Sequence, residues 1–329
     1  MTVKNLIVSS SPHIGTKTTT QSIMRDVIIA LSPATVAGIV LFGWKALVTI
    51  LVCVSSAVAS EFLFNLAVRK KQTVTDLSAV VTGLLLALTL PTTAEIWHCI
   101  VGSVFAIVVV KCLFGGIGCN FANPAITARI LLISSFSSAI ATGSQTVFQT
   151  AEAGVDTVAS ATPLAITKVS GVVSELPSIT DMLIGNRGGA IGETCIIALL
   201  LGFVYLLVRK VITWHIPVIY IGSTAVLSLL LEMTMYADAD PMMVLYQSLG
   251  GGLFLGAIFM ATDYVTTPIN KVGKMVFALG CALLTVLIRM GGYPEGVSFA
   301  ILIMNILAPY IEKGCAPKPF GKVGANSEK

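Results

Sequence analysis

The chain has 329 residues, of which 55% are hydrophobic and 11% are charged, and its mean hydropathy is +0.92. Soluble domains carry about 25% charged residues, so this composition excludes a soluble globular protein and indicates an integral membrane protein. The formal net charge is +4, and its meaning depends on where the charges lie. A chain of this length has room for roughly ten spans of about 20 residues with short connections.

Apolar runs predict an all-α membrane protein with about ten transmembrane helices, five on each side of a long polar loop. The first run follows a polar leader and lacks a small-residue cleavage site, so we expect a membrane helix rather than a cleaved signal. The predicted spans, in chain order, lie at about 27–43, 46–68, 77–91, 96–113, 123–137, 193–209, 211–231, 245–263, 274–290 and 296–312.

Basic residues fall on one side of the membrane when these spans alternate. If the N-terminus is cytoplasmic, the cytoplasmic side receives Lys4, Lys17, Arg25, Arg69, Lys70, Lys71, Lys111, Arg209, Lys210, Lys271, Lys274 and the lysines of the C-terminus. The opposite side receives Glu95, the acidic segment 232–240 and the long loop. By the positive-inside rule, residues 1–26 and 313–329 are predicted to be cytoplasmic, and residues 138–192 to form an extracytoplasmic loop.

The two predicted halves, residues 27–137 and 193–312, share a pattern. Each has a Thr-Thr pair beside proline, then an apolar helix, a basic residue and Gly-Gly; the stretches are LPTTAEIWHCIVGSVFAIVVVKCLFGG (90–116) and VTTPINKVGKMVFALGCALLTVLIRMGG (265–292). Five spans per half invert the second half relative to the first, so the pattern predicts two inverted five-helix repeats with broken helices. Chance similarity between apolar helices is the alternative.

A glycine-rich segment follows the fourth predicted span. The sequence GGIGCNFANPAITARI (115–130) contains Gly115, Gly116 and Gly118 and leads into a helix with Pro124 in its first turn. Free N–H groups at the start of that helix could receive an anion or a polarised carbonyl. Close helix packing through small residues is the alternative.

Two acidic residues lie in or near the apolar spans. Glu61 stands in VASEFLF and Asp263 in MATDYVTT. An ionisable residue at a helix centre costs about 2.5–3.5 kcal/mol on insertion scales, so both are candidates for a cation or proton path, with Asp263 favoured because it begins the repeated break. The alternative is that each lies near a membrane boundary and meets water or a basic partner.

The cysteines and histidines make no cluster with the spacing of metal ligands. We therefore expect packing roles for most cysteines, no metal site, and no haem or iron–sulfur centre. The residues are Cys53, Cys99, Cys112, Cys119, Cys195, Cys281, Cys315, His13, His98 and His215.

The long loop contains a small polar motif, AGVDTVASATPLA (153–165). Thr162 offers a hydroxyl next to Pro163, and Asp156 and Ser160 could hold a local turn that presents it. From the residues alone, an ordinary polar loop is the favoured interpretation.

The core of this motif, DTVASATPL, resembles the flavinylation sequence of membrane flavoproteins. That resemblance implies FMN joined to Thr162 through a phosphoester by a dedicated flavin transferase, with Asp156, Ser160 and Ala161 as the other matching positions. Ala159 departs from the pattern, since the family usually has Ser or Thr there, and this puts the efficiency of the transferase in question.

The resemblance extends along the chain through SSSPHI (9–14), GGIGCNFANPA (115–125), the flavinylation sequence and FMATDYVTTP (259–268). These occur in the order typical of the family that comprises the D subunit of the Rnf electron-transport complex and the B subunit of the sodium-translocating NADH:quinone reductase. The compact N-terminus favours the Rnf protein. The resemblance implies a flavoprotein subunit, not catalytic alone, of a ferredoxin:NAD⁺ oxidoreductase that pumps Na⁺ or H⁺ across the plasma membrane of a prokaryote.

The implied partners are the other Rnf subunits, including another covalent-FMN subunit; ferredoxin and NAD would bind partner subunits, because no dinucleotide fingerprint occurs here. No nucleic acid is expected. A second, noncovalent flavin, riboflavin or another, is expected near the broken helices. There Gly115, Gly116 and Gly118 would permit close approach of the backbone, and Asn120 and Asn123 could bond the polar edge of the ring. The rival interpretations are a quinone reductase subunit and a non-redox transporter or channel with inverted repeats.

Overall fold

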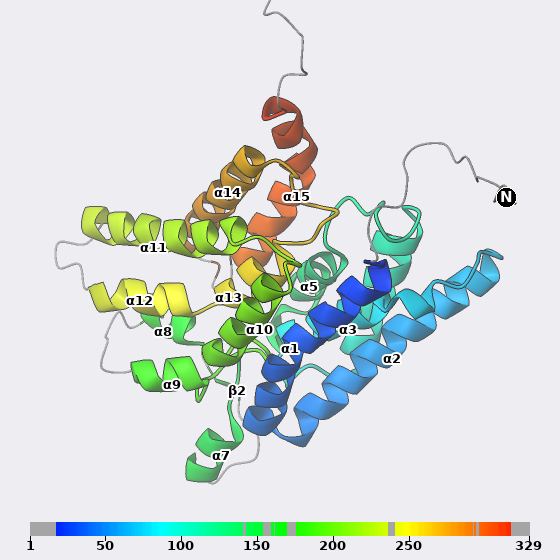
Figure 1. The fold of residues 1–329 in the computed structure, drawn as a ribbon. Coiled ribbons are helices and arrows are strands. Elements are labelled where there is room, and N and C mark those ends of the chain that lie inside the picture. The colour runs from blue at the N-terminus through cyan, green and yellow to red at the C-terminus, as the bar shows by residue number, and fades with distance from the viewer. Residues whose placement is uncertain are drawn as a thin grey trace, which may run out of the picture.

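In the computed structural model, the described residues are 18–140, 143–153, 159–160, 162–169, 176–235, 241–291, 293 and 296–316, and most of them are helical (Figure 1). The first half of the chain forms two long helices, two short ones and a helix that ends in a wider π-helical turn. Its elements are α1 (Thr20–Phe42), α2 (Trp44–Ala67), the 3₁₀ turn η1 (Val74–Asp76), α3 (Ser78–Thr89), α4 (Ile96–Val104), the π-helical η2 (Phe105–Cys112) and α5 (Pro124–Ser135).

The second half again combines long helices with an interrupted one. A break at residues 250–252 separates α12 from α13, which continues directly into the π-helical η4. The elements are α10 (Ile196–Val208), α11 (His215–Met235), α12 (Pro241–Leu249), α13 (Leu253–Leu255), η4 (Gly256–Met260), α14 (Lys271–Met290) and α15 (Val297–Gly314).

The loop between the halves has short elements of its own. They are α6 (Ser137–Ile140), β1 (Gly143–Ser144), α7 (Val147–Ala153), β2 (Ala159–Ser160), α8 (Pro163–Val169) and α9 (Ile179–Ile184). β1 and β2 are antiparallel, with Gly143 opposite Ser160 and Ser144 opposite Ala159. Ser144 also accepts a hydrogen bond from the Thr92 N–H at 2.7 Å through its hydroxyl, so the loop is attached to the segment that follows α3.

The described residues contain five helices that are long and apolar enough to cross a membrane. These are Thr20–Phe42, Trp44–Ala67, His215–Thr234, Lys271–Met290 and Val297–Gly314, and the pair Met242–Leu249 and Leu253–Met260, bent by 53°, makes a sixth if it is one span. The expected helical membrane protein is therefore confirmed. Ten spans remain a prediction, since a 12-residue helix such as α3 is about 18 Å long, against a hydrocarbon core of about 30 Å.

The first helix begins at Thr20, earlier than the start predicted near residue 27. Thr19 and Ser22 form a reciprocal capping box that satisfies the first N–H groups. Asp26, which the sequence placed in the N-terminal segment, is buried in this helix and pairs with Arg209, at the end of α10, at 3.1 Å. Asp26 thus lies inside the helix and has a partner from the second half.

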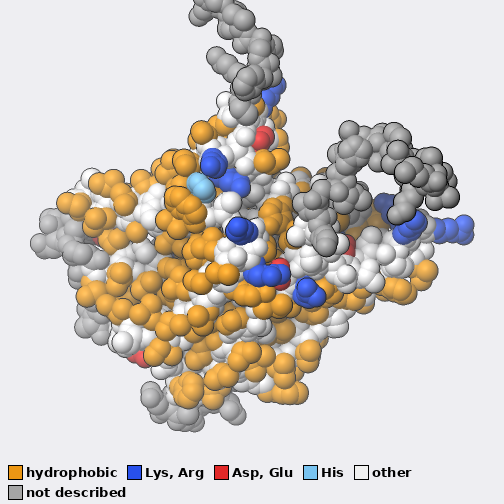
Figure 2. All heavy atoms as spheres, viewed as in Figure 1, with side chains coloured by type: hydrophobic (Ala, Val, Ile, Leu, Met, Phe, Trp, Pro, Cys, Tyr) orange, Lys and Arg blue, Asp and Glu red, His pale blue; other side chains and the backbone are white. Residues whose placement is uncertain are grey.

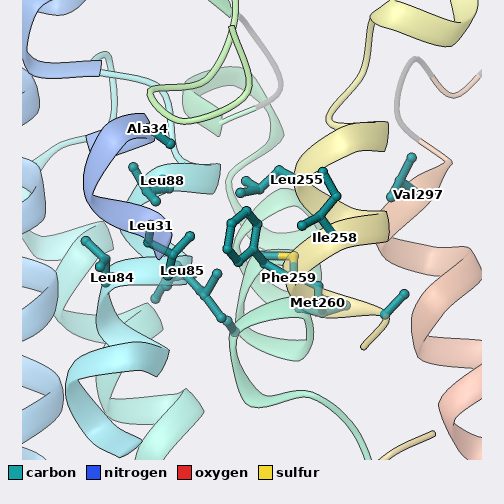
Figure 3. Packing of buried hydrophobic residues seen from close by; sticks show 14 of the residues in the cluster. Leu31, Ala34, Leu84, Leu85, Leu88, Leu255, Ile258, Phe259, Met260 and Val297 are labelled. Carbon is teal, nitrogen blue, oxygen red and sulfur yellow. The ribbon is translucent and has the colours of Figure 1, made fainter. Parts of the chain in front are cut away.

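The core lies where the two halves meet. Figure 3 shows Leu31, Leu85 and Leu88 of the first half facing Leu255, Ile258 and Phe259 of the second. Helices α1 and α10 approach so closely at Gly202 that a Cβ there would collide with the Ala30 carbonyl and lie 2.9 Å from the Phe259 ring. The halves therefore share one continuous apolar core.

The surface carries broad apolar areas, as expected for a membrane protein. In the view of Figure 2, hydrophobic side chains cover most of the face, while Lys and Arg gather toward the side where α1 begins. Arg25, Arg209, Lys210 and Lys271 are exposed. This grouping agrees with the predicted orientation, which stays a prediction because the structure contains no membrane.

The matching stretches 90–116 and 265–292 fold alike in their described residues. In each, a nonhelical Thr-Thr segment precedes a helix that leads into a glycine-containing end; the helix is α4 with η2 in the first and α14 in the second. The two differ in that the first ends in π-helix and the second is regular. This likeness is local, and the inverted relation of the halves remains a prediction.

Candidate functional site: a cavity and an acceptor threonine at opposite ends of the fold

A cavity of about 380 Å³ lies between the two halves, beside the start of α1. Its walls are mostly apolar, with polar groups contributed by α3, η2, the turn before α5 and the segment after η4. The lining residues include Thr20, Ile23, Met24, Val27, Ser78, Val81, Thr82, Leu85, Lys111, Gly118, Asn120, Asn123, Leu206, Phe259, Thr262, Asp263 and Tyr264.

Part of the glycine-rich turn lines this cavity. Gly118 lines the cavity, whereas Gly115 and Gly116 are outside its lining. Gly116 and Gly118 have φ values of 99° and 89°, and a Cβ at either would meet nothing within 4 Å. Glycine is therefore required here for the backbone conformation of the turn rather than for close packing.

Asn123 caps α5 and joins the two halves. Its Oδ1 accepts hydrogen bonds from the N–H groups of Ala125 (3.0 Å) and Ile126 (3.4 Å), and its Nδ2 donates to the Met260 carbonyl at 3.3 Å. The expectation of free N–H groups at the start of this helix is therefore wrong for these two, because the side chain of the N-cap residue satisfies them.

Asn120 and Asp263 lie together on the cavity wall. The Asn120 amide donates to the Ala122 carbonyl at 3.0 Å and also interacts with the Asp263 carboxyl. Asp263 accepts from the Val265 N–H and the Thr266 hydroxyl, both at 3.4 Å. The Asp263 carboxyl is therefore oriented by residues of its own turn, and it lies partly buried at the edge of the cavity.

Glu61 has a basic partner, as one interpretation of the sequence allowed. Lys111 of η2 donates to Glu61 Oε1 at 2.9 Å, and Lys111 and Glu61 are only 3% and 1% exposed. Lys111 also donates to the Ser78 hydroxyl at 2.6 Å, and Lys111 and Ser78 both line the cavity. The structure thus brings an ion pair to the cavity that contains Asp263.

Thr162 lies in the loop between the halves, immediately before α8. It is half-buried, and its hydroxyl accepts from the Ala165 N–H at 3.3 Å. Leu164 packs against the break at Gly250 and Gly251, within 3.7 and 3.1 Å of a Cβ built at each. Ser160 is in β2, while Asp156 and Ala161 are outside the described residues.

Two arginines hold the break between α12 and α13. Arg187 donates to the carbonyls of Glu193 and Leu249, both at 3.0 Å, and Arg289 donates to those of Gln247 (2.6 Å) and Gly250 (3.4 Å). Carbonyls freed at a break in a membrane protein need such donors. Burial lowers the pKa of the Arg187 guanidinium to about 10, opposed by Glu193, so Arg187 is charged at neutral pH.

A buried ion pair completes this cluster around the break. Arg129 of α5 donates to Glu193 Oε1 at 2.7 Å, and a Cβ at Gly252 would lie 2.5 Å from the same oxygen. Gly252 has a φ of 67°, so both conformation and space require glycine. Our sequence interpretation overlooked these arginines and the pairing of Lys111; charged residues next to apolar runs were the available signal.

The cavity and Thr162 are at opposite ends of the fold. The first turns of α1 line the cavity. The loop containing Thr162 packs against the other end of α1, where Leu41 lies 2.9 Å from a Cβ built at Gly185. Figure 1 shows α8 and α9 on the side where α1 ends. The 23 residues of α1 span about 35 Å at 1.5 Å per residue.

Among the described residues, no three His, Cys, Asp or Glu side chains are placed to hold a metal ion. All seven cysteines are described and free, and Cys53, Cys99, Cys112 and Cys281 are buried. Burial of these four cysteines is consistent with the expected packing role.

These features define a helical membrane protein with an interrupted helix, a polar-edged cavity at one end and a half-buried threonine in a loop at the other. The chain belongs to the family described as NQR2, RnfD, RnfE, which matches residues 7–321. The resemblance found in the motifs is therefore confirmed.

Three relatives illustrate the similarity. The chain is 44% identical to the D subunit of the Na⁺-translocating ferredoxin:NAD⁺ oxidoreductase complex of Acetobacterium woodii, over 96% of each chain. It is 40% identical to the D subunit of the proton-translocating ferredoxin:NAD⁺ oxidoreductase complex of Clostridium ljungdahlii, over 97% of each. It is 32% identical to the D subunit of the ion-translocating oxidoreductase complex of Methanosarcina acetivorans, over 96% of this chain and 97% of that one.

Proposed function

We propose that this chain is a flavoprotein subunit of an ion-translocating ferredoxin:NAD⁺ oxidoreductase complex in a prokaryotic plasma membrane. In this proposal it carries FMN on Thr162 and a noncovalent flavin in the cavity, and it relays electrons. The observation that carries the proposal is the placement of the Thr162 hydroxyl, half-buried in the loop between the halves and at the far end of α1 from the cavity. Family membership over nearly the whole chain supports it.

The surroundings of Thr162 fit a covalently attached phosphate group. Within the described part of the chain, the hydroxyl is engaged by one weak contact from the Ala165 N–H at 3.3 Å, so a phosphoester at this oxygen breaks little existing structure. The nearby break is lined by the charged groups of Arg187 and Arg289, which are held by backbone carbonyls. The proposed FMN supplies the electron-transfer chemistry, and the protein supplies attachment and electrostatics.

The cavity fits a second flavin in size and in chemistry. Its volume of about 380 Å³ lies in the range of roughly 300–1,000 Å³ that is common for small-molecule sites, and such sites combine apolar walls with a few directed polar groups. Asn120, Lys111 and Asp263 supply those groups. Asn123 holds the wall in place rather than offering free polar atoms, because both ends of its amide are engaged.

Similarity to known proteins does not distinguish Na⁺ from H⁺ as the coupling ion. One relative is named for Na⁺ and another for protons, at 44% and 40% identity. Asp263 and Glu61 remain the candidate positions for an ion path. The proposed partners are the other subunits of the complex, including another with covalent FMN, a flavin transferase, and ferredoxin and NAD bound to partner subunits.

Measuring covalent and released flavin in the purified complex tests this function. After denaturation, the band of this subunit on a gel should fluoresce, and about one further flavin per copy of the chain should be released in soluble form. A non-redox transporter would give neither signal, and a band without fluorescence would contradict the assignment of Thr162. Na⁺-dependent and H⁺-dependent turnover in vesicles would then separate the two coupling ions.

A further inference from the structure

We infer that Thr73, Glu61 and Lys111 form a proton relay between the cavity and the surface that carries Arg69, Lys70 and Lys71. This inference rests on the proposed flavin in the cavity, and it assigns that flavin a source of protons. The relay is a row of side chains from three separate elements: the loop before η1, helix α2 and the π-helical η2. Glu61 was a candidate for an ion path in general, and this inference gives the path an entrance, an exit and a direction.

The entrance is at Thr73. This residue is exposed and follows the basic loop 69–71. Its hydroxyl donates to Glu61 Oε1 at 2.6 Å and accepts from the Asn65 amide at 3.0 Å. A hydroxyl can accept a proton from water while it donates its own, so Thr73 connects solvent directly to a carboxylate that is 1% exposed.

The exit is at Lys111. Its ammonium donates to Glu61 Oε1 at 2.9 Å and to the Ser78 hydroxyl at 2.6 Å, and Lys111 and Ser78 both line the cavity. Ser78 is itself fixed by Asp76, whose carboxylate accepts from the Ser78 N–H at 2.9 Å. The distance from Thr73 to Lys111 is thus covered by two consecutive hydrogen bonds that share one oxygen of Glu61.

Glu61 has a spare oxygen at the centre of this row. Its Oε2 is buried and has no hydrogen-bond partner among the described residues. A purely structural buried ion pair needs its remaining lone pairs satisfied, and such pairs are often no better for stability than apolar residues. An unsatisfied oxygen on a carboxylate between solvent and a cavity is instead suited to a group that takes up and releases a proton.

Other titratable groups surround the relay. Asp76 lies behind Ser78, Cys112 follows Lys111 and is close enough to interact electrostatically with Glu61, Lys111 and Lys70, and Asp263 lines the same cavity.

In the proposed transfer, reduced ferredoxin on a partner subunit would supply the electrons that reach the flavin in the cavity. Each proton taken up with them would come from water at Thr73, which leaves hydroxide in the solvent. The Lys111 ammonium would break one N–H bond, give that proton to the flavin and become a neutral amine. Glu61 receives a proton through the Thr73 hydroxyl and passes it to Lys111 Nζ, which restores the original ion pair.

The test uses the purified complex and the variants Glu61→Gln and Thr73→Val. Both variants should keep the same amount of releasable flavin per copy of the chain. In both, reduction of that flavin, followed by its absorbance after mixing with reductant, should be slower by on the order of 10²-fold, which is typical for loss of a proton-transfer group. A small weak acid such as hydrazoic acid should restore the rate. The matched control is Thr75→Val, a neighbouring exposed threonine outside the row.

An infrared difference spectrum of reduced minus oxidised complex gives a readout that is independent of rate. A change in the carboxylic acid stretching region should be present in the wild type and absent from Glu61→Gln. Wild-type rates and an unchanged infrared signal in both variants, with flavin retained, would overturn the relay alone. A wild-type complex without releasable flavin would overturn both the relay and the second-flavin part of the proposed function.

Discussion

At the scale of single residues, the number of hydrogen bonds that a polar side chain makes indicates whether it is available for modification or holds the backbone. The Thr162 hydroxyl has one contact with the backbone of α8, at 3.3 Å, in the described part of the chain. Arg187, in contrast, has two carbonyl partners and is 3% exposed. The first residue is suited to accept a modification, while the second holds backbone groups at the break.

Thr162→Ala should abolish covalent flavin fluorescence of the denatured subunit while leaving membrane insertion unchanged. The substitution removes the only oxygen to which the phosphoester is assigned, and it costs one weak capping contact. Gel fluorescence after denaturation measures the loss, and immunoblotting of membranes measures insertion. Thr150→Ala, in α7 of the same loop, is the matched control and should fluoresce normally. Fluorescence retained in Thr162→Ala would refute the acceptor assignment.

Arg187→Met should destabilise the protein by about 2–5 kcal/mol, because it leaves buried carbonyls at the break without this donor and removes a cation near Glu193. Thermal unfolding of the detergent-purified protein measures the effect. Arg25→Met, at an exposed arginine, should change stability by less than about 0.5 kcal/mol. Equal stability of both variants would show that the break is held by other groups.

At the scale of elements, the short helix α5 explains how a glycine turn can form a cavity wall. Gly116 and Gly118 take positive φ values that reverse the chain after η2. Asn123 then caps α5 and reaches across to the Met260 carbonyl of η4. The turn is therefore anchored to both halves, and Asn120 is carried to the cavity beside Asp263.

Asn120→Leu should lower the amount of flavin released on denaturation and leave the covalent signal at Thr162 unchanged. Asn120 is on the cavity wall but has no part in the cap of α5. Asn123→Ala is the companion variant: it should reduce stability by about 0.5–2 kcal/mol through loss of the cap. Extraction of noncovalent flavin and gel fluorescence separate the two signals. A normal released fraction in a folded Asn120→Leu complex would exclude this amide from the binding site.

At the scale of the whole molecule, the two sites are separated along α1, and charge is distributed along the same direction. The cavity is lined by the first turns of α1, where Arg25 is exposed and Asp26 pairs with the exposed Arg209, and the loop with Thr162 lies at the other end of α1. With the positive-inside rule, we expect the cavity toward the cytoplasm and Thr162 outside. The arrangement provides a proposed electron carrier near each membrane surface.

Cysteine labelling in intact cells should confirm this orientation. In a background without the exposed Cys119, a cysteine at Thr180 should react with a membrane-impermeant maleimide added outside, and one at Gln72 should not. Both positions are exposed in the structure, so reactivity reports the side of the membrane. Gln72 should become reactive once the cells are permeabilised. The reverse pattern would overturn the orientation and exclude an external flavin transferase.

The class of protein, its family and the candidate acceptor Thr162 could be predicted from the sequence, because each depends on a local pattern. Composition required a membrane protein, the apolar runs located the helices to within a few residues in most cases, and DTVASATPL pointed to Thr162. These features are local, since propensity and hydropathy act over one helix or one motif. The start of α1 at Thr20 was missed although its cap by Thr19 and Ser22 is local. The pairing of Asp26 with Arg209, far away in sequence, could not be predicted from a local pattern.

Which charged groups share a site depends on the tertiary structure. Glu61 and Lys111 are 50 residues apart, and Arg129 and Glu193 are 64 residues apart; no spacing rule joins either pair. A charge in an apolar segment must be paired or face a cavity, but the sequence does not say with which partner. The partners were set by the packing of the helices against one another, and that packing also formed the cavity between the two halves.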